Sequence, residues 1–65
     1  MRLTFLGTNS GNGECPAVYM TDRGTIVVQG KIIEDREALG DLVNLAADET
    51  AVEIPQELLP FFPQR

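Results

Sequence analysis

Hydrophobic and polar positions alternate most clearly between Cys15 and Ile33. Two runs rich in β-branched and aromatic residues, AVYMT and TIVVQ, flank the tetrapeptide TDRG. In this tetrapeptide Asp22 lies early in the turn, and Gly24 stands where a left-handed conformation is usually needed. The pattern predicts a β-hairpin over residues 17–29, with one of its faces forming the core.

Further elements are needed, because a hairpin alone is only marginally stable in water. Apolar side chains alternate along RLTFLG, residues 2–7, which favours a short strand. The segment TNSGNGECP, residues 8–16, is rich in Gly, Asn and Ser and predicts a loop. Gly30 is expected to bend the chain, so that residues 31–33 either continue the second hairpin strand or begin a new strand at an angle.

A helix is predicted over about residues 36–46. Asp35 suits its N-cap, and the helix dipole favours an acid such as Glu37 in the first turn. The apolar residues of this segment have the i, i+3, i+4, i+7 spacing of one buried stripe: Leu39, Leu42, Val43 and Ala46. Gly40 costs about 1 kcal/mol relative to Ala, so the helix should depend on packing.

The C-terminal segment predicts one more strand and a short helical turn. AVEI, residues 51–54, alternates as a strand does, and Pro55 ends it. Pro55 followed by QELL favours one helical turn, which Pro60 prevents from extending far. The tail LLPFFP either folds back over the open face of the sheet or exposes Phe61 and Phe62 to a partner.

These elements predict a single small α+β domain, residues 1–65. Its small antiparallel sheet has three to four strands around the central hairpin 17–29, with one helix at about 36–46 and a short C-terminal helical turn. A chain of 65 residues buries only about 60% of its unfolded surface, so its stability should be modest. The 43% hydrophobic and 23% charged content is that of a globular protein, so we expect the chain to fold.

Charge is distributed unevenly along the chain. The net charge of −5 opposes direct binding to nucleic acid, because that affinity depends on neutralising phosphates. Residues 1–33 carry three basic and two acidic side chains, whereas residues 34–65 carry two basic and eight acidic ones. The acidic half is either a solubilising surface or a docking surface for a basic partner.

Catalytic and metal-binding chemistry find little support in the sequence. Histidine is absent, and the only serine, Ser10, has no evident activating partner. The single cysteine, Cys15, excludes an internal disulfide and cannot build a zinc site alone. The glycine-rich loop leads into a strand and lacks the Lys-Ser or Lys-Thr pair of a phosphate-binding loop. We therefore expect a protein that is not an enzyme and has no catalytic, cofactor or metal site.

A membrane role is also not expected from the sequence. No apolar run approaches the ~20 residues that cross a bilayer, and the N-terminus lacks the basic and apolar regions of a signal peptide. We expect a cytoplasmic protein, in which Cys15 remains a thiol.

Four short segments suggest a family. They are SGNGEC at residues 10–15, AVYMT at 17–21, TIVVQ at 25–29 and AVEIPQELLPFF at 51–62. In this combination the chain resembles the small acidic actinobacterial proteins of unknown function, known from Streptomyces, that are encoded beside phage-repressor-like helix-turn-helix regulators. The second strand of the commonest group ends in Arg-Asp-Ser, whereas this chain has VQG at 28–30 and then inserts DREALGDLVNL. It therefore looks like a divergent relative or a sister family.

The resemblance implies a regulatory accessory protein in sporulation or secondary-metabolism circuits, acting by binding the neighbouring helix-turn-helix regulator. Toxin-antitoxin-like pairing is a second implication. We expect the partner to contact one of two surfaces, the acidic face or the apolar tail, whose residues are Glu34, Asp35, Glu37 and Asp41, and Phe61 and Phe62. The alternative is a self-associating structural or small-ligand-binding domain, for example a homodimer through the hairpin edge.

Overall fold

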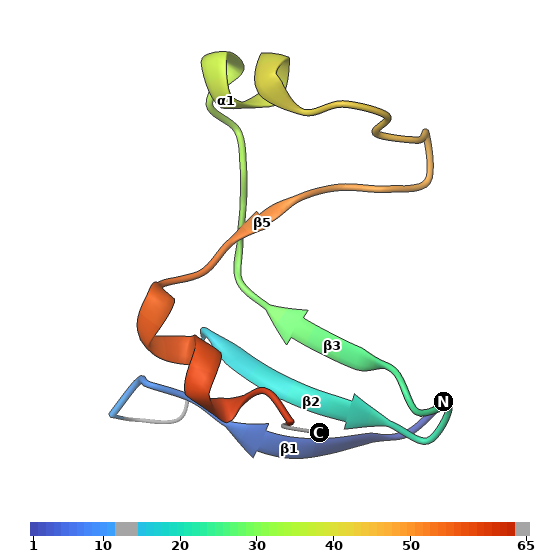
Figure 1. Cartoon of the computed structure of the whole chain (residues 1–65), viewed down its shortest axis with the longest axis vertical. Helices are drawn as coiled ribbons and strands as arrows, with labels where there is room; N and C mark the ends of the chain where they lie inside the picture. The colour runs from blue at the N-terminus through green and yellow to red at the C-terminus, as the bar shows by residue number, and fades with distance from the viewer. Residues whose placement is uncertain (12–14, 64–65) are drawn as a thin grey trace.

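The computed structural model describes residues 1–11 and 15–63, which form two parts (Figure 1). A three-stranded sheet and a short 3-10 helix make up the body, residues 1–29 and 56–63. Residues 30–55 form the arm, which leaves the body after the third strand and returns to the 3-10 helix. The Cα radius of gyration is 13.1 Å, against about 11 Å for a compact chain of this length, because the arm projects from the body.

The sheet of the body contains the predicted hairpin. Its strands are β1 (Leu3–Gly7), β2 (Ala17–Thr21) and β3 (Ile26–Gln29), all antiparallel and in the order β1-β2-β3. Phe5 of β1 lies opposite Tyr19 of β2, and their rings meet edge to face with centroids 5.8 Å apart. The predicted α+β fold with a central hairpin is therefore confirmed, and so is the strand predicted within residues 2–7.

The hairpin turn is organised by Thr21. Its N–H donates to the Thr25 carbonyl at 2.9 Å, and its hydroxyl accepts from the N–H groups of Arg23 and Thr25 at 3.1 and 3.2 Å. Gly24 has a φ of 81°, the left-handed conformation that the sequence predicted. These bonds satisfy the polar groups of Thr21 and allow it to be buried, with 4% of its surface exposed.

The core of the described residues lies in the body. Ala17 and Val18 of β2 and Leu58 of the 3-10 helix η1 (Gln56–Phe61) have no exposed surface. Fully burying a side chain such as Val or Leu stabilises a protein by about 1.5–3 kcal/mol. The prediction that the tail folds back over the sheet is confirmed for Leu58. A Cβ added at Gly7 would overlap the ring of Phe61, so η1 approaches β1 closely.

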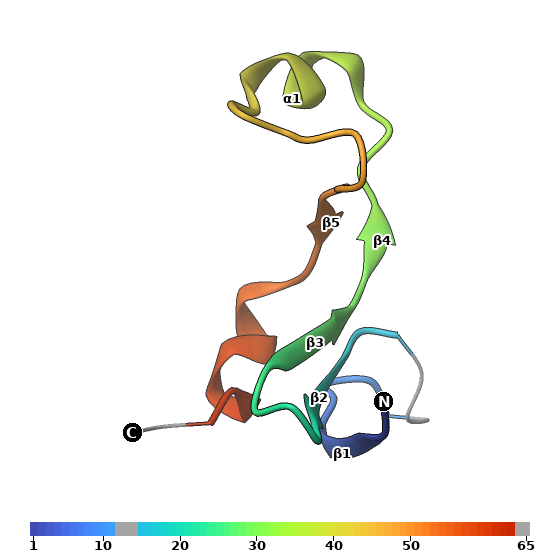
Figure 2. The same cartoon turned by 90° about the vertical axis from the view of Figure 1, so that its right-hand side faces the viewer.

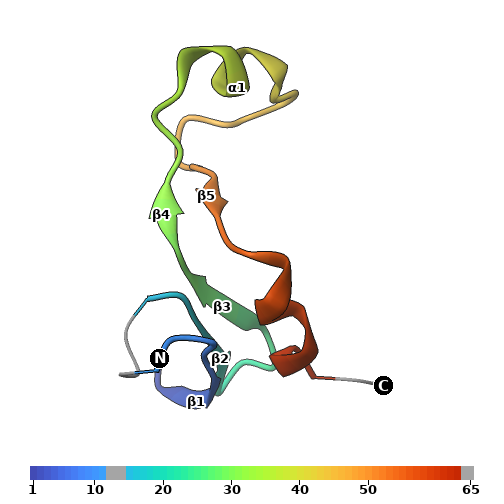
Figure 3. The ribbon, with the colours of Figure 1, turned by 90° about the vertical axis from the view of Figure 1, so that its left-hand side faces the viewer.

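Two very short strands form the stem of the arm. β4 (Lys31–Ile32) and β5 (Val52–Glu53) pair antiparallel, as Figure 2 and Figure 3 show. Gly30 separates β3 from β4, so of the two predictions for residues 31–33 the new strand is correct. A Cβ at Gly30 would lie 2.8 Å from the carbonyl oxygen of Glu53, so glycine permits the two segments of the stem to approach each other here.

The helix of the arm is shorter than predicted. α1 spans Arg36–Asp41 and not residues 36–46. Leu42 is already extended, and Asn44 has a φ of 61°, a left-handed conformation that ends helices. An acid in the last turn without a basic residue opposes the helix dipole, and Gly40 lowers helix propensity further.

The predicted buried stripe of the helix is wrong. Every residue of α1 is described, and none of them is buried. The physical reason is the position of the helix, because it stands at the end of the arm, away from the sheet that would have to cover it (Figure 1). Without such packing, the intrinsic propensity of these residues is not enough to extend the helix beyond Asp41.

The predicted loop at residues 8–16 is described only at its ends, and residues 12–14 lie outside the described residues. The Thr8 hydroxyl donates to the carbonyl of Pro16, and the N–H of Ser10 donates to the Thr8 hydroxyl at 3.0 Å. These bonds hold the start of the segment against the entrance to β2.

Candidate protein-binding site

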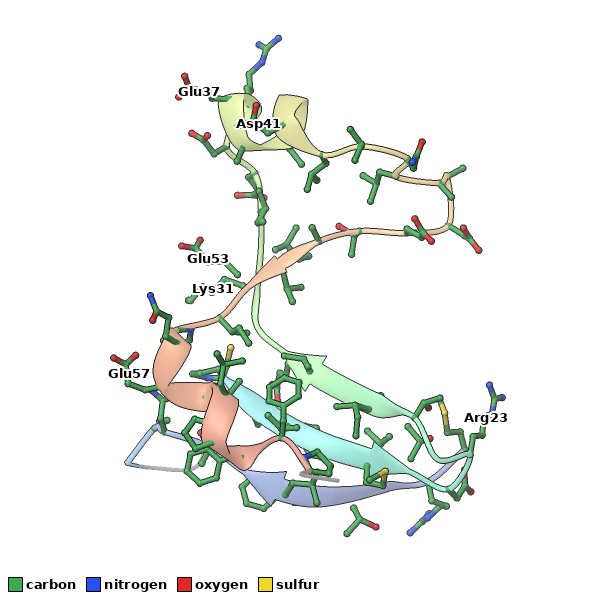
Figure 4. All side chains as sticks on the ribbon, in the orientation of Figure 1. Arg23, Lys31, Glu37, Asp41, Glu53 and Glu57 are labelled. Carbon is green, nitrogen blue, oxygen red and sulfur yellow. The ribbon has the colours of Figure 1, made fainter. Side chains whose placement is uncertain are left out.

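The four acidic residues predicted to bind a partner lie together on the arm. Glu34 and Asp35 follow β4, and Glu37 and Asp41 belong to α1. All four side chains are exposed, and Figure 4 shows Glu37 and Asp41 at the tip of the arm. The structure therefore presents these carboxylates on one projecting element, well away from the sheet.

Asp35 also has a structural role at this site. Its Oδ2 atom accepts a hydrogen bond from the N–H of Ala38 at 2.9 Å, and its carbonyl accepts from the N–H of Leu39 at 3.0 Å. The predicted N-cap is confirmed, and such caps contribute about 1 kcal/mol. Because the cap occupies one carboxylate oxygen of Asp35, its three neighbours are better placed to bind a partner.

Exposed apolar side chains accompany the acidic residues. They include the stripe that the sequence predicted to be buried, and Val43 is the most exposed of them, at 83%. The large apolar residues exposed on the arm are Ile32, Leu39, Leu42, Val43, Leu45 and Val52. Apolar surface with a charged rim is the anatomy of protein-protein interfaces, and an exposed apolar patch often marks one.

A hollow of about 470 Å³ lies where β4 leads into α1. Its walls combine three aliphatic side chains with three carboxylates: Ile32, Ile33, Ala38, Glu34, Asp35 and Glu53. A Lys or Arg side chain fits this combination, because its alkyl stem packs on apolar surface while its charged end meets carboxylates. The hollow can therefore accept a basic side chain from a partner.

Phe61 and Phe62 are not brought to this site. They lie at the end of η1, on the body, whereas α1 stands at the far end of the molecule (Figure 1). Phe61 packs against Gly7, and Phe62 is half-buried, with its N–H donating to the Leu59 carbonyl at 3.0 Å. Leu59 and Phe61 are 54% and 39% exposed, so the tail leaves some apolar surface open on the body while Phe62 is partly covered.

A second hollow, of about 410 Å³, lies at the base of the arm. It is lined from both parts of the molecule, by Cys15, Pro16, Lys31, Glu53, Ile54 and Pro55. Lys31 and Glu53 are directly opposite each other in the β4–β5 pair, and Figure 4 shows their side chains close together. The Cys15 thiol donates to the Gln29 carbonyl, with Sγ 3.7 Å from the oxygen. The first contact lies within the arm and the second within the body, and the hollow lies where the two parts meet.

Glu53 and the exposed apolar residues were missed as candidate site residues. The sequence predicted an outward Glu53 in a strand. Its place in the same hollow as Glu34 depends on the pairing of β4 with β5, and strands of two residues show no alternation. The exposure of Val43 did have a signal, because Gly40 and Asn44 are poor residues for a helix that must be held by packing.

Other kinds of site are not found in the part of the chain that the structure describes. There, no three His, Cys, Asp or Glu side chains are grouped so as to hold a metal ion. No helix among the described residues has the length and apolarity that crossing a bilayer requires. Comparison of the chain with protein-family models, with curated proteins and with solved structures finds no match. The function has to be inferred from the surface itself.

Proposed function

We propose that this chain is a non-enzymatic regulatory accessory protein that binds a basic partner protein through its arm. The observation that carries the proposal is the exposure of Leu39, Leu42 and Val43 beside the carboxylates of Glu37 and Asp41. The part of these side chains that stays in water adds nothing to the stability of the free protein, and a partner that covers it gains about 25 cal/mol for each Å² of apolar surface.

The distribution of charge supports a basic partner. The arm, residues 30–55, carries two basic and seven acidic side chains, whereas the rest of the chain carries three of each. The net charge of −5 therefore belongs to the arm. Such a surface repels phosphates and attracts basic protein surfaces, which raises the association rate with the right partner.

A helix-turn-helix regulator is the partner we propose. The support is the resemblance to proteins encoded beside such regulators, together with the charge of their DNA-binding surface, which is basic because it neutralises phosphates. The acidic arm would occupy that surface, so the regulator would bind either this protein or DNA. The hollow between β4 and α1 offers a place for one of the basic side chains of the regulator.

The binding test uses the purified protein and a phage-repressor-like helix-turn-helix regulator, with fluorescence anisotropy as the readout. We expect saturable binding at low salt that weakens steeply as salt rises, because the Debye length falls from about 10 Å at 0.1 M to about 3 Å at 1 M ionic strength. Operator DNA should compete with the protein. Absence of binding at low salt would refute the proposal.

Matched variants locate the contact. Replacing Glu37 by Gln together with Asp41 by Asn should raise Kd by roughly three- to tenfold and flatten its salt dependence, as expected for two partly exposed ion pairs. Glu57→Gln, which removes a carboxylate from η1, is the control and should leave Kd unchanged.

Apolar contacts are tested in the same way. Leu42→Ala combined with Val43→Ala should weaken binding at every salt concentration, because apolar contacts are not screened by ions. Leu59→Ala is the control, since that side chain is exposed on the body. If Leu59→Ala weakens binding and the arm variants do not, the docking surface lies at the C-terminal tail and not on the arm.

A further inference from the structure

Strand β1 is an edge of the sheet and lies on the side of the body away from the arm (Figure 1). The N–H of Asp22 donates to the carbonyl of Arg2 at 3.1 Å, so the backbone groups of Arg2 point toward β2. Backbone direction alternates along a strand, so Thr4 also faces β2, whereas Leu3 and Phe5 direct their N–H and C=O groups outward. An edge of this kind is a template for another strand.

The side chains of this edge do little to prevent pairing. Leu3 and Phe5 are 48% and 53% exposed, and Thr4 between them is exposed as well. Edge strands are usually protected by charged residues, Pro or bulges, and here the bulge lies only at the end of the strand, between Phe5 and Gly7. The stretch Leu3–Phe5 is therefore uncharged, regular and open.

The opposite edge, β3, is less accessible. Gln29 at its end leads through Gly30 into β4, so the arm rises beside the outer side of β3 (Figure 1). A strand added to β3 would have to enter the corner between the sheet and the arm. Of the two edges of the sheet in the described part of the chain, β1 is the one that a second molecule can reach.

We propose that two copies of this chain pair antiparallel through β1, with Thr4 of one copy opposite Thr4 of the other. In this register Leu3 lies opposite Phe5 of the second copy, and these two residues exchange both of their outward hydrogen bonds. The pairing is self-complementary, as a two-fold symmetric interface requires. The result is one continuous sheet with three strands from each copy.

Charge favours a second copy at this edge. The body carries two basic and three acidic side chains, a net charge of only −1, so two bodies meet with little net repulsion. Association through the arms would instead bring two acidic surfaces together. Pairing through β1 leaves both arms exposed on the outside, so this inference does not depend on the proposed function.

The test is analytical ultracentrifugation of the full chain over a concentration series. The wild type should change from a mass of 7.1 kDa to twice that mass, because an edge of five residues gives a weak, reversible dimer. Thr4→Lys and Thr4→Glu should each remain monomeric, since like charges directly opposite each other destabilise strand pairs. An equal mixture of the two variants should again form dimers, while Thr4→Val alone should dimerise like the wild type.

A second variant keeps the test decisive if a charge at Thr4 disturbs folding, which circular dichroism would reveal. Thr4→Cys in a Cys15→Ser background should form a disulfide between copies on mild oxidation, because Cα atoms of such a pair lie about 4.5 Å apart, within the range that disulfides need. Arg23→Cys in the same background, at the exposed hairpin turn, is the control and should not. A wild type that is monomeric at all concentrations, or a dimer that survives Thr4→Lys, would overturn the proposal.

Discussion

Both the body and the arm contain apolar side chains at regular spacing, but only the body buries any of them completely. In the body, Val18 of the hairpin and Leu58 of η1 lose all contact with water. In the arm, Leu39 and Val43 have the spacing of a buried helix face and remain exposed. The comparison shows that amphipathic spacing alone determines neither how far a helix extends nor whether it is buried, because both depend on a second element close enough to cover it.

The body and the arm also differ in charge. The body carries two basic and three acidic side chains, whereas the arm carries seven acidic side chains against two basic ones. Self-repulsion in the arm opposes its collapse onto a small hydrophobic core of its own, while the nearly neutral body folds with little of that cost. The arm is thus better suited to binding than to adding stability.

The largest expected difference between the parts concerns buried leucine. Leu58→Ala should lower the free energy of unfolding by about 2–5 kcal/mol, because it leaves a cavity under η1. Leu45→Ala removes an exposed leucine from the arm and should change this free energy by less than about 0.5 kcal/mol. Urea denaturation followed by circular dichroism measures both. Equal losses would mean that the arm contributes to the core after all.

An intermediate effect is expected at the base of the arm. Gly30→Ala places a Cβ 2.8 Å from the Glu53 carbonyl oxygen and should open the β4–β5 pair at a cost of about 1–3 kcal/mol. Amide exchange by NMR should then accelerate roughly fivefold or more at Ile33, whose N–H donates across the arm, and not at Thr21 in the hairpin. Equal acceleration at both amides would show that the two parts open as one unit.

The smallest effect is expected in α1. An added Cβ at Gly40 meets no atom within 4 Å, so Gly40→Ala should stabilise the helix by about 1 kcal/mol and slow amide exchange at Leu39 roughly fivefold. Gly11→Ala, which is equally unobstructed, is the control and should leave Leu39 unchanged. If Gly40→Ala raised the unfolding free energy of the body as well, the separation between body and arm would be wrong.

The hairpin and the short helix of the body were predictable because their turn and proline residues are distinctive. Gly24 and the alternating runs on either side of it define the hairpin, and Pro55 and Pro60 limit η1 to a short helix. Asp35 likewise indicated where α1 begins. Each of these signals depends on neighbours in the sequence, which is why it could be interpreted without knowing the fold.

The arm was less predictable because the length and exposure of its helix follow from the absence of a second element packed against it. The sequence placed four carboxylates in one segment, and they do lie together. It did not show that the β4–β5 pair would carry α1 away from the sheet, so the stripe including Leu39 and Val43 was expected to be buried. The hollow lined by Ile32 and Glu53 also requires the pairing of β4 with β5. Strands of two residues are too short to be predicted from alternation in the sequence.

The pairing of β4 with β5 has an evolutionary consequence. The segment that begins at Gly30 runs beside the segment that ends at Glu53. The two ends of the arm therefore lie next to each other where they join the body. Everything beyond that junction can be lengthened, shortened or exchanged without moving the sheet, and the entropic cost of closing a longer loop grows only slowly with length. One unchanging scaffold can in this way carry different recognition segments, each suited to its own partner.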